Sequence, residues 1–117
     1  ELVSSMKTKM VEANGIGLAA PQVGHNIRLM VIKLGTGQIV ELINPRISWT
    51  SDTRVKIEEG CLSIPGKLIW IERPDKVRVK FQTCEGEYKY WCLNGMDARV
   101  FLHEYDHLEG VLMTDRL

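Results

Sequence analysis

Two histidines spaced four residues apart carry the strongest chemical signal in the sequence. They stand in the stretch His103-Glu104-Tyr105-Asp106-His107. On a helix, residues i and i+4 lie about 40° apart around the axis, so both imidazoles can reach one metal ion. A glutamate beside the first histidine can hydrogen-bond a water at that ion, which is the HExxH arrangement of metallohydrolases. Taken alone, the pattern is equally compatible with a helix that carries two surface histidines by chance.

A catalytic metal site needs at least one more protein ligand. No histidine follows His107, so the further ligand is expected upstream. The best candidate is Cys61, in Glu59-Gly60-Cys61-Leu62-Ser63-Ile64-Pro65, where a glycine lets another chain or a ligand approach the backbone. A thiolate with two imidazoles suits Zn²⁺ or Fe²⁺. The alternative is a small buried hydrophobic residue, which is the role we expect for Cys84 and Cys92.

The elements that must position these residues follow from periodicity. Apolar residues recur every four positions from Leu2 to Met10, which predicts a helix that ends near Asn14-Gly15. The glycine-rich segment 15–24 is expected to be an irregular loop or a short extended piece. Alternating patterns then predict several short antiparallel strands between residues 27 and 90, with one face packed on a helix. One of these strands is expected to end at Asn44-Pro45.

A second helix is predicted to carry the histidines. Asn94 followed three residues later by Asp97 is typical of a helix N-cap with an acidic N3 residue. Met96, Val100 and the two histidines share one face of this helix. Gly110 is expected to end it.

Length and composition set the class of protein. A chain of 117 residues predicts one domain over residues 1–117. Lys plus Arg and Asp plus Glu both count 15, which argues against a general affinity for nucleic acid. No apolar run approaches a membrane span, and three cysteines predict a reducing, cytoplasmic compartment. Because the chain begins with Glu1 inside a predicted helix, we expect an incomplete N-terminus and leave an organellar origin open.

Three segments together resemble the motifs of the peptide deformylase family, in the family's order. They are Gly15-Ile16-Gly17-Leu18-Ala19-Ala20-Pro21-Gln22, Glu59-Gly60-Cys61-Leu62-Ser63 and His103-Glu104-Tyr105-Asp106-His107. The resemblance covers nearly the whole chain. It implies an α+β fold with antiparallel strands packed around a central HExxH helix. It also implies a metal-dependent hydrolase that removes the N-formyl group from the N-terminal formylmethionine of newly synthesised proteins and releases formate.

The resemblance implies a role for each matching residue. The metal ligands would be Cys61, His103 and His107, binding one Fe²⁺ in the family's usual state, with Zn²⁺ or Ni²⁺ as substitutes. Glu104 would act as general base and then as acid. The oxyanion would be stabilised by the Gln22 side-chain amide and the Leu62 backbone N–H. Methionine-pocket or backbone contacts would come from Ile16, Gly17, Gly60, Met96 and Val100.

The chain departs from the family pattern in two places. Leu102 stands where the family usually has glutamine, which predicts altered surroundings of the first metal histidine without loss of activity. The long C-terminal helix of many members does not follow, which puts ribosome docking through it in doubt and leaves the ribosome open as a partner without this helix. The expected partners are N-formylmethionyl nascent peptides, without nucleic acid or membrane binding, and the expected state is a monomer.

Two charged features near the motifs have open alternatives. Arg99, one turn before His103, is expected to form a structural salt bridge in preference to lining a pocket. Glu59 and Arg73 match a family pair that supports the cysteine loop. The alternative is an exposed ion pair of little energetic value.

Two other functions compete with the deformylase interpretation. An endopeptidase of the zincin type would explain His103, Glu104 and His107 but neither Cys61 nor Gln22. A non-catalytic protein with a structural metal predicts a closed site of four ligands. Such a site needs no Glu104 and no Gln22.

Overall fold

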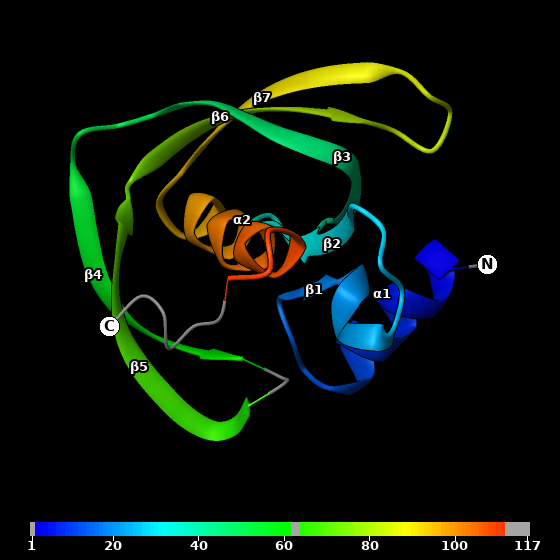
Figure 1. Cartoon of the computed structure of the whole chain (residues 1–117), viewed down its shortest axis with the longest axis horizontal. Coiled ribbons are helices and arrows are strands. Elements are labelled where there is room, and N and C mark those ends of the chain that lie inside the picture. Colours follow the sequence, from blue (N-terminus) through cyan, green and yellow to red (C-terminus); the bar gives the residue numbers. More distant parts are fainter. Residues whose placement is uncertain (1, 62–63, 112–117) are drawn as a thin grey trace.

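The protein is described by a computed structural model that covers residues 2–61 and 64–111, with backbone alone at 61, 64, 65 and 67. Two helices, seven strands and a short 3₁₀ helix are described there (Figure 1). In chain order they are α1 (Leu2–Glu12), β1 (Gly17–Ala19), the 3₁₀ helix Ala20–Val23, β2 (Leu29–Lys33), β3 (Ile39–Thr50), β4 (Arg54–Cys61), β5 (Ile64–Pro74), β6 (Lys76–Gln82), β7 (Tyr88–Asn94) and α2 (Gly95–Leu108).

The strands form two antiparallel sheets that curve around α2 (Figure 1). The larger sheet has the order β1-β2-β3-β6-β7, and β4 pairs with β5 in a separate hairpin. The main core lies between the larger sheet and α2, and its fully buried side chains include Met30, Ile32, Leu42, Val77, Val79, Phe81 and Phe101. The expected α+β fold, with antiparallel strands packed around the central HExxH helix, is confirmed.

Strand β2 is buried on both faces, which its sequence alone does not reveal. Met30 and Ile32 face the core under α2, whereas Leu29 and Val31 pack in a second cluster with Met6 and other residues of α1. A strand covered on both sides is an almost continuous apolar run and not an alternating one. The short β2 therefore lies between two hydrophobic clusters, one shared with α2 and the other with α1.

The ends of α2 agree only partly with prediction. Asn94 is the N-cap in an extended conformation, but its side chain makes no capping hydrogen bond. Asp97 instead accepts a hydrogen bond of 2.8 Å from the backbone N–H of Gly35, in the turn between β2 and β3. At the other end Gly110 has φ of 76°, and the N–H of Val111 donates to the carbonyl of Asp106 at 2.8 Å. These features are those of a Schellman termination, so the predicted stop at Gly110 is confirmed.

Strand β3 continues through Asn44-Pro45, so the prediction that it ends there was wrong. The register with β6 shifts between Ile43 and Arg46, and Asn44 has a positive φ of 50°. The shift is a bulge, where a residue is left out of the ladder and proline's missing N–H costs no hydrogen bond. The Pro45 carbonyl accepts a hydrogen bond from the Arg28 side chain at 3.0 Å.

Both cysteines of the β6–β7 hairpin are exposed, contrary to the expectation that they are small buried hydrophobic residues. Cys92 points outward because its neighbour Leu93 is the residue that faces the core. The Cys84 thiol lies 3.5 Å from a carboxylate oxygen of Glu41. Neither helix in the described part of the chain has the length and apolar character to cross a membrane.

Candidate active site

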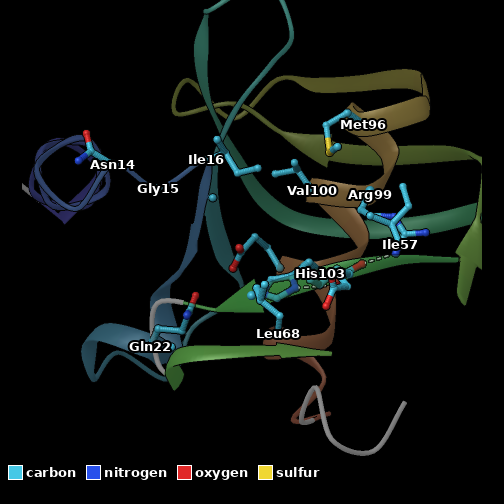
Figure 2. Close-up of a pocket in the computed structure, with 16 residues that line it drawn as sticks. Asn14, Gly15, Ile16, Gln22, Ile57, Leu68, Met96, Arg99, Val100 and His103 are labelled. Carbon is cyan, nitrogen blue, oxygen red and sulfur yellow. Dashed lines mark hydrogen bonds and ion pairs between the residues drawn. The ribbon is translucent and has the colours of Figure 1, made fainter. Parts of the chain in front are cut away.

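A cavity of about 850 Å³ lies where the N-terminal segment, the β4–β5 hairpin and α2 meet (Figure 2). All five residues expected to contact the substrate line this cavity: Ile16, Gly17, Gly60, Met96 and Val100. It is also lined by Gln22, His103 and Glu104. Three motifs that are far apart in the sequence therefore contribute to one cavity.

One wall of the cavity is apolar. Ile16 points toward Val100, which comes from α2 with Met96 one turn before it (Figure 2). Ile16 and Met96 are half exposed, at 51% and 56%, whereas Val100 is buried. Leu68 of β5 adds a further apolar side chain that the sequence reasoning missed. An open apolar wall of this kind can hold a flexible aliphatic side chain such as methionine.

The two histidines of α2 lie on one side of the helix, as their spacing predicts. Their ring centroids are 5.2 Å apart with an angle of 67° between the planes. Nδ1 of His103 lies 2.8 Å from a carboxylate oxygen of Glu59. A carboxylate only accepts, so Nδ1 carries the proton of this contact, which in a neutral imidazole leaves the lone pair on Nε2. A carboxylate behind a histidine in this way is the usual support of a metal ligand.

Cys61 is the last residue of β4, and its backbone pairs with Ile64. Glu59, two residues earlier on the same strand, contacts His103, so the end of β4 lies beside the histidine helix. The Cys61 side chain and the whole of Leu62 lie outside the described residues. The described donors are two imidazoles, and a carboxylate fixes the tautomer of one of them. Imidazole nitrogens suit divalent ions such as Zn²⁺ and Fe²⁺.

Glu104 is buried, and strand β1 approaches it closely. Its side chain is 4% exposed. A Cβ atom added to Gly17 would lie 2.7 Å from Oε2 and 2.9 Å from Cγ of Glu104. Any larger residue at position 17 would therefore displace this carboxylate. Glycine at this position thus keeps the space that Glu104 occupies beside the cavity, in addition to its expected backbone contacts.

The Gln22 amide is oriented by its own 3₁₀ helix. Its oxygen accepts a hydrogen bond of 2.8 Å from the Ala19 backbone N–H. Because the amide must present oxygen to an N–H donor, its NH₂ group is turned away from Ala19. Gln22 also lines the cavity (Figure 2). The residue is thus held in one orientation, with its donor group on the opposite side from the backbone contact.

A buried cluster of charges surrounds Glu59. Arg73 donates to both of its carboxylate oxygens, at 2.6 and 2.9 Å, and also to Asp106 at 2.8 Å. Arg99 donates to Glu59 and to the backbone carbonyl of Ile71 at 3.0 Å. Arg99 therefore forms the expected salt bridge but also lines the cavity, and the Glu59–Arg73 pair is buried, not exposed. Two carboxylates and two guanidinium groups balance the charge of the cluster.

The surroundings of Glu59 keep it ionised. Burial alone would raise the pKa of this carboxyl, but hydrogen bonds from His103 and Arg73, with the positive charge of Arg73, lower the pKa to about 2. For Arg73, burial lowers the pKa, and the hydrogen bonds and charge of Glu59 outweigh it, so its pKa is raised. Glu59 is thus a permanent negative charge behind His103.

Two residues in or next to the HExxH motif make contacts that the motif did not indicate. Asp106 is buried and joins the charge cluster through Arg73; the only sequence signal was an acidic residue on the buried side of the helix. Leu102, in place of the family's glutamine, packs into the main core. It therefore contributes apolar packing next to the first histidine.

Known proteins resemble this chain over nearly its full length. The model of the family described as polypeptide deformylase matches residues 1–117. A peptide deformylase of Thermotoga maritima is 44% identical over 98% of this chain and 70% of its own length. Peptide deformylase 1B of Arabidopsis thaliana, a chloroplastic and mitochondrial protein, is 45% identical over 99% of this chain, which spans only 44% of that relative.

Solved structures agree in fold as well as in sequence. A probable peptide deformylase from Synechococcus phage S-SSM7 superposes with a TM-score of 0.93 at 42% identity, covering 99% of this chain and 81% of that one. A plant peptide deformylase, PDF1B, gives a TM-score of 0.95 at 45% identity, covering 99% and 65%. The chain therefore belongs to the polypeptide deformylase family of hydrolases, as its three motifs indicated.

Proposed function

We propose that this chain is a metal-dependent deformylase that removes the N-formyl group from formylmethionyl nascent peptides and releases formate. The observation that carries the proposal is the single cavity in which the HExxH helix, Gln22 and the end of β4 meet beside an apolar wall. Family membership supports the same reaction. The relatives from Thermotoga maritima and Arabidopsis thaliana are both named as peptide deformylases.

The metal site proposed here consists of Cys61, His103 and His107. Fe²⁺ is the first choice of ion, with Zn²⁺ or Ni²⁺ as substitutes, because a thiolate and two imidazoles accept all three. A divalent ion bound there supplies Lewis acidity toward the formyl oxygen and a lower pKa for water. Glu59 orients His103 for this role through the hydrogen bond to Nδ1.

The chain's own groups would move the proton and hold the substrate. Glu104 takes the proton of the attacking water on its carboxylate and then donates it to the leaving amine nitrogen. The NH₂ group of Gln22 and the backbone N–H of Leu62 donate to the oxygen that becomes negative. Ile16, Met96 and Val100 hold the methionine side chain and so fix the position of the formyl carbon.

The direct test offers one pair of peptides and casein to the anaerobically iron-loaded protein. We expect formate from formyl-Met-Ala and no acetate from acetyl-Met-Ala, because a formyl carbon carries only hydrogen and fits where a methyl group does not. Casein measures endopeptidase activity in the same preparation. Casein cleavage without formate release would favour a zincin-type protease, and neither product from a metal-loaded protein would favour a structural metal site.

Metal content tests the role of Cys61. The wild type should bind about one ion per chain, and Cys61→Ala should lose most of it because one ligand of three is removed. Cys84→Ala and Cys92→Ala are matched controls, since both residues are exposed on the β6–β7 hairpin. Elemental analysis of the three variants makes the comparison. Equal metal content in all of them would remove Cys61 from the site.

Gln22 is tested with two variants that differ in what they keep. Gln22→Leu removes the whole amide, whereas Gln22→Glu keeps an oxygen for the Ala19 N–H and removes only the NH₂ donor. If the NH₂ group stabilises the oxyanion, both should lower kcat by about 100-fold or more. KM should change far less. A raised KM with an unchanged kcat would make Gln22 a binding residue. Near-normal kcat in Gln22→Glu would limit the role of Gln22 to its contact with the Ala19 N–H.

A further inference from the structure

The outer surface of β3, β6 and β7 carries interleaved aromatic and basic side chains. In β6, Val77, Val79 and Phe81 are buried, so Arg78 and Lys80 between them point to the opposite face. The antiparallel register places Arg46 and Tyr90 on either side of Lys80, Trp49 beside Arg78, and Tyr88 beside Gln82. We call this surface the outer strand face; it consists of Arg46, Trp49, Arg78, Lys80, Tyr88 and Tyr90. Neither helix covers it, since α2 lies inside the curve of the sheet and α1 beside β1 and β2 (Figure 1).

The three rings of this face are accessible and are held by its cations. Trp49, Tyr88 and Tyr90 are 42%, 59% and 69% exposed. The guanidinium carbon of Arg78 lies 4.9 Å from the centroid of the Trp49 ring, and the Lys80 ammonium lies 4.5 Å from that of Tyr88. Exposed aromatic rings grouped on one side of a small protein are uncommon unless they bind something.

Charge is one-sided on the outer strand face, although it balances over the whole chain. Residues 46–50, 76–82 and 88–94 contain no aspartate or glutamate and place four basic side chains on this side of the sheet. The fifth basic residue, Lys89, lies opposite the buried Phe81 and so belongs to the inner side. Within the described part of the chain, none of these four forms an ion pair: Arg46, Lys76, Arg78 and Lys80. Acidic residues lie beyond these segments, at Asp75, in the 85–87 turn and at Glu41 in the first half of β3, where Glu41 pairs with Lys7 of α1. The face therefore favours a polyanion.

We propose that the outer strand face binds single-stranded RNA. Bases have flat faces that stack on exposed tyrosine and tryptophan rings, and a sheet surface with such rings is a common platform for them. The arginines and lysines between the rings supply charge for the phosphates. The expectation of no nucleic-acid binding rested on the net charge of zero, which averages over this local excess.

An anionic membrane would also be attracted to basic and aromatic side chains, but it suits the outer strand face less well than RNA. Membrane-surface binding depends on apolar side chains that enter the acyl region. All of the exposed large hydrophobic residues on these three strands are aromatic, and two of the three are tyrosines. The face is also separate from hydrolysis, since no described residue that lines the cavity belongs to β3, β6 or β7. RNA and a formyl peptide can therefore be bound together.

The experiment measures binding of a fluorescent oligouridylate of about 12 nucleotides by anisotropy at low and physiological salt. We expect Tyr90→Ala and Tyr88→Ala each to weaken binding by about fivefold or more, the loss of one stacked base. Lys80→Glu should weaken it by at least a similar factor and make it less sensitive to salt. Formyl-peptide hydrolysis and the thermal unfolding temperature should stay unchanged in the tyrosine variants.

Matched controls come from outside the outer strand face. Trp70 of β5 is a 55% exposed aromatic residue, and Lys9 of α1 is an exposed cation. Trp70→Ala and Lys9→Glu should leave RNA binding unchanged. The proposal is overturned by equal losses in these controls, by wild-type affinity in both tyrosine variants, or by binding to phosphatidylserine vesicles without binding to RNA.

Discussion

Replacing Glu104 with alanine should lower the turnover of formyl-peptide hydrolysis by about 10,000-fold, the upper end for general acid–base catalysis. The upper end is expected because one carboxylate serves both steps, accepting the proton from water and passing it to the amine. Glu104 lines the cavity and is not one of the proposed ligands. The variant should therefore keep about one metal ion per chain and still bind a hydroxamate inhibitor. Formate release, elemental analysis and inhibitor titration measure the three quantities.

Two control variants accompany Glu104→Ala, one expected to lose all three properties and one expected to keep them. His103→Ala should lose activity, metal and hydroxamate binding together, because two ligands seldom hold a catalytic ion. Glu12→Ala removes an exposed carboxylate at the end of α1 and should change none of them. Near-normal turnover in Glu104→Ala would show that the proposed proton transfer is wrong, even though the family assignment would stand. Loss of the metal in the same variant would make Glu104 a ligand instead.

The parts of the site that could be predicted are those encoded within a few residues. The HExxH spacing is a property of one helix, so the placement of His103 and His107 on one side of α2 was predictable from the 3.6-residue turn. The end of α2 at Gly110 was predictable for the same reason, because the Schellman termination involves only adjacent residues. Convergence of the three motifs required the family resemblance, since spacing alone does not bring Gln22 near His103.

The parts that could not be predicted depend on contacts across the fold. Asn94 and Asp97 hold the N-cap and N3 positions that the local rule predicts, but the partner of Asp97 is a turn 62 residues away, which no local rule can indicate. Strand β3 passes Pro45 because a bulge accommodates it, and a bulge has no reliable mark in a single sequence. Arg99 forms an ion pair with Glu59, which lies 40 residues earlier in the sequence. The charge balance around Glu59 thus becomes visible only when β4, β5 and α2 are assembled.

Removing the Glu59 carboxylate should be among the most destabilising changes in the molecule. Glu59→Ala leaves Arg73 with Asp106 and Arg99 with backbone carbonyls, so one buried positive charge loses its counterion. Breaking a buried ion pair in this way costs about 3–5 kcal/mol. Urea unfolding of the metal-free protein measures the loss without a contribution from metal binding. Glu72→Ala is the matched control on the same hairpin, because its ion pair with Arg54 is exposed and should contribute about 1 kcal/mol or less.

Metal affinity separates the positioning role of Glu59 from its contribution to stability. Without its carboxylate acceptor, His103 is no longer held in one tautomer and orientation, and affinity should fall by about 10- to 100-fold. Leu42→Ala should destabilise the fold by a similar amount, about 2–5 kcal/mol, but Leu42 belongs to the main core opposite Met30 of β2 and not to the charge cluster around Glu59. Chelator competition on the folded fraction of each variant compares the two. Equal affinities in Glu59→Ala and Leu42→Ala would reduce Glu59 to a structural residue, whereas weaker binding in Glu59→Ala alone would show that the carboxylate orients the first metal histidine.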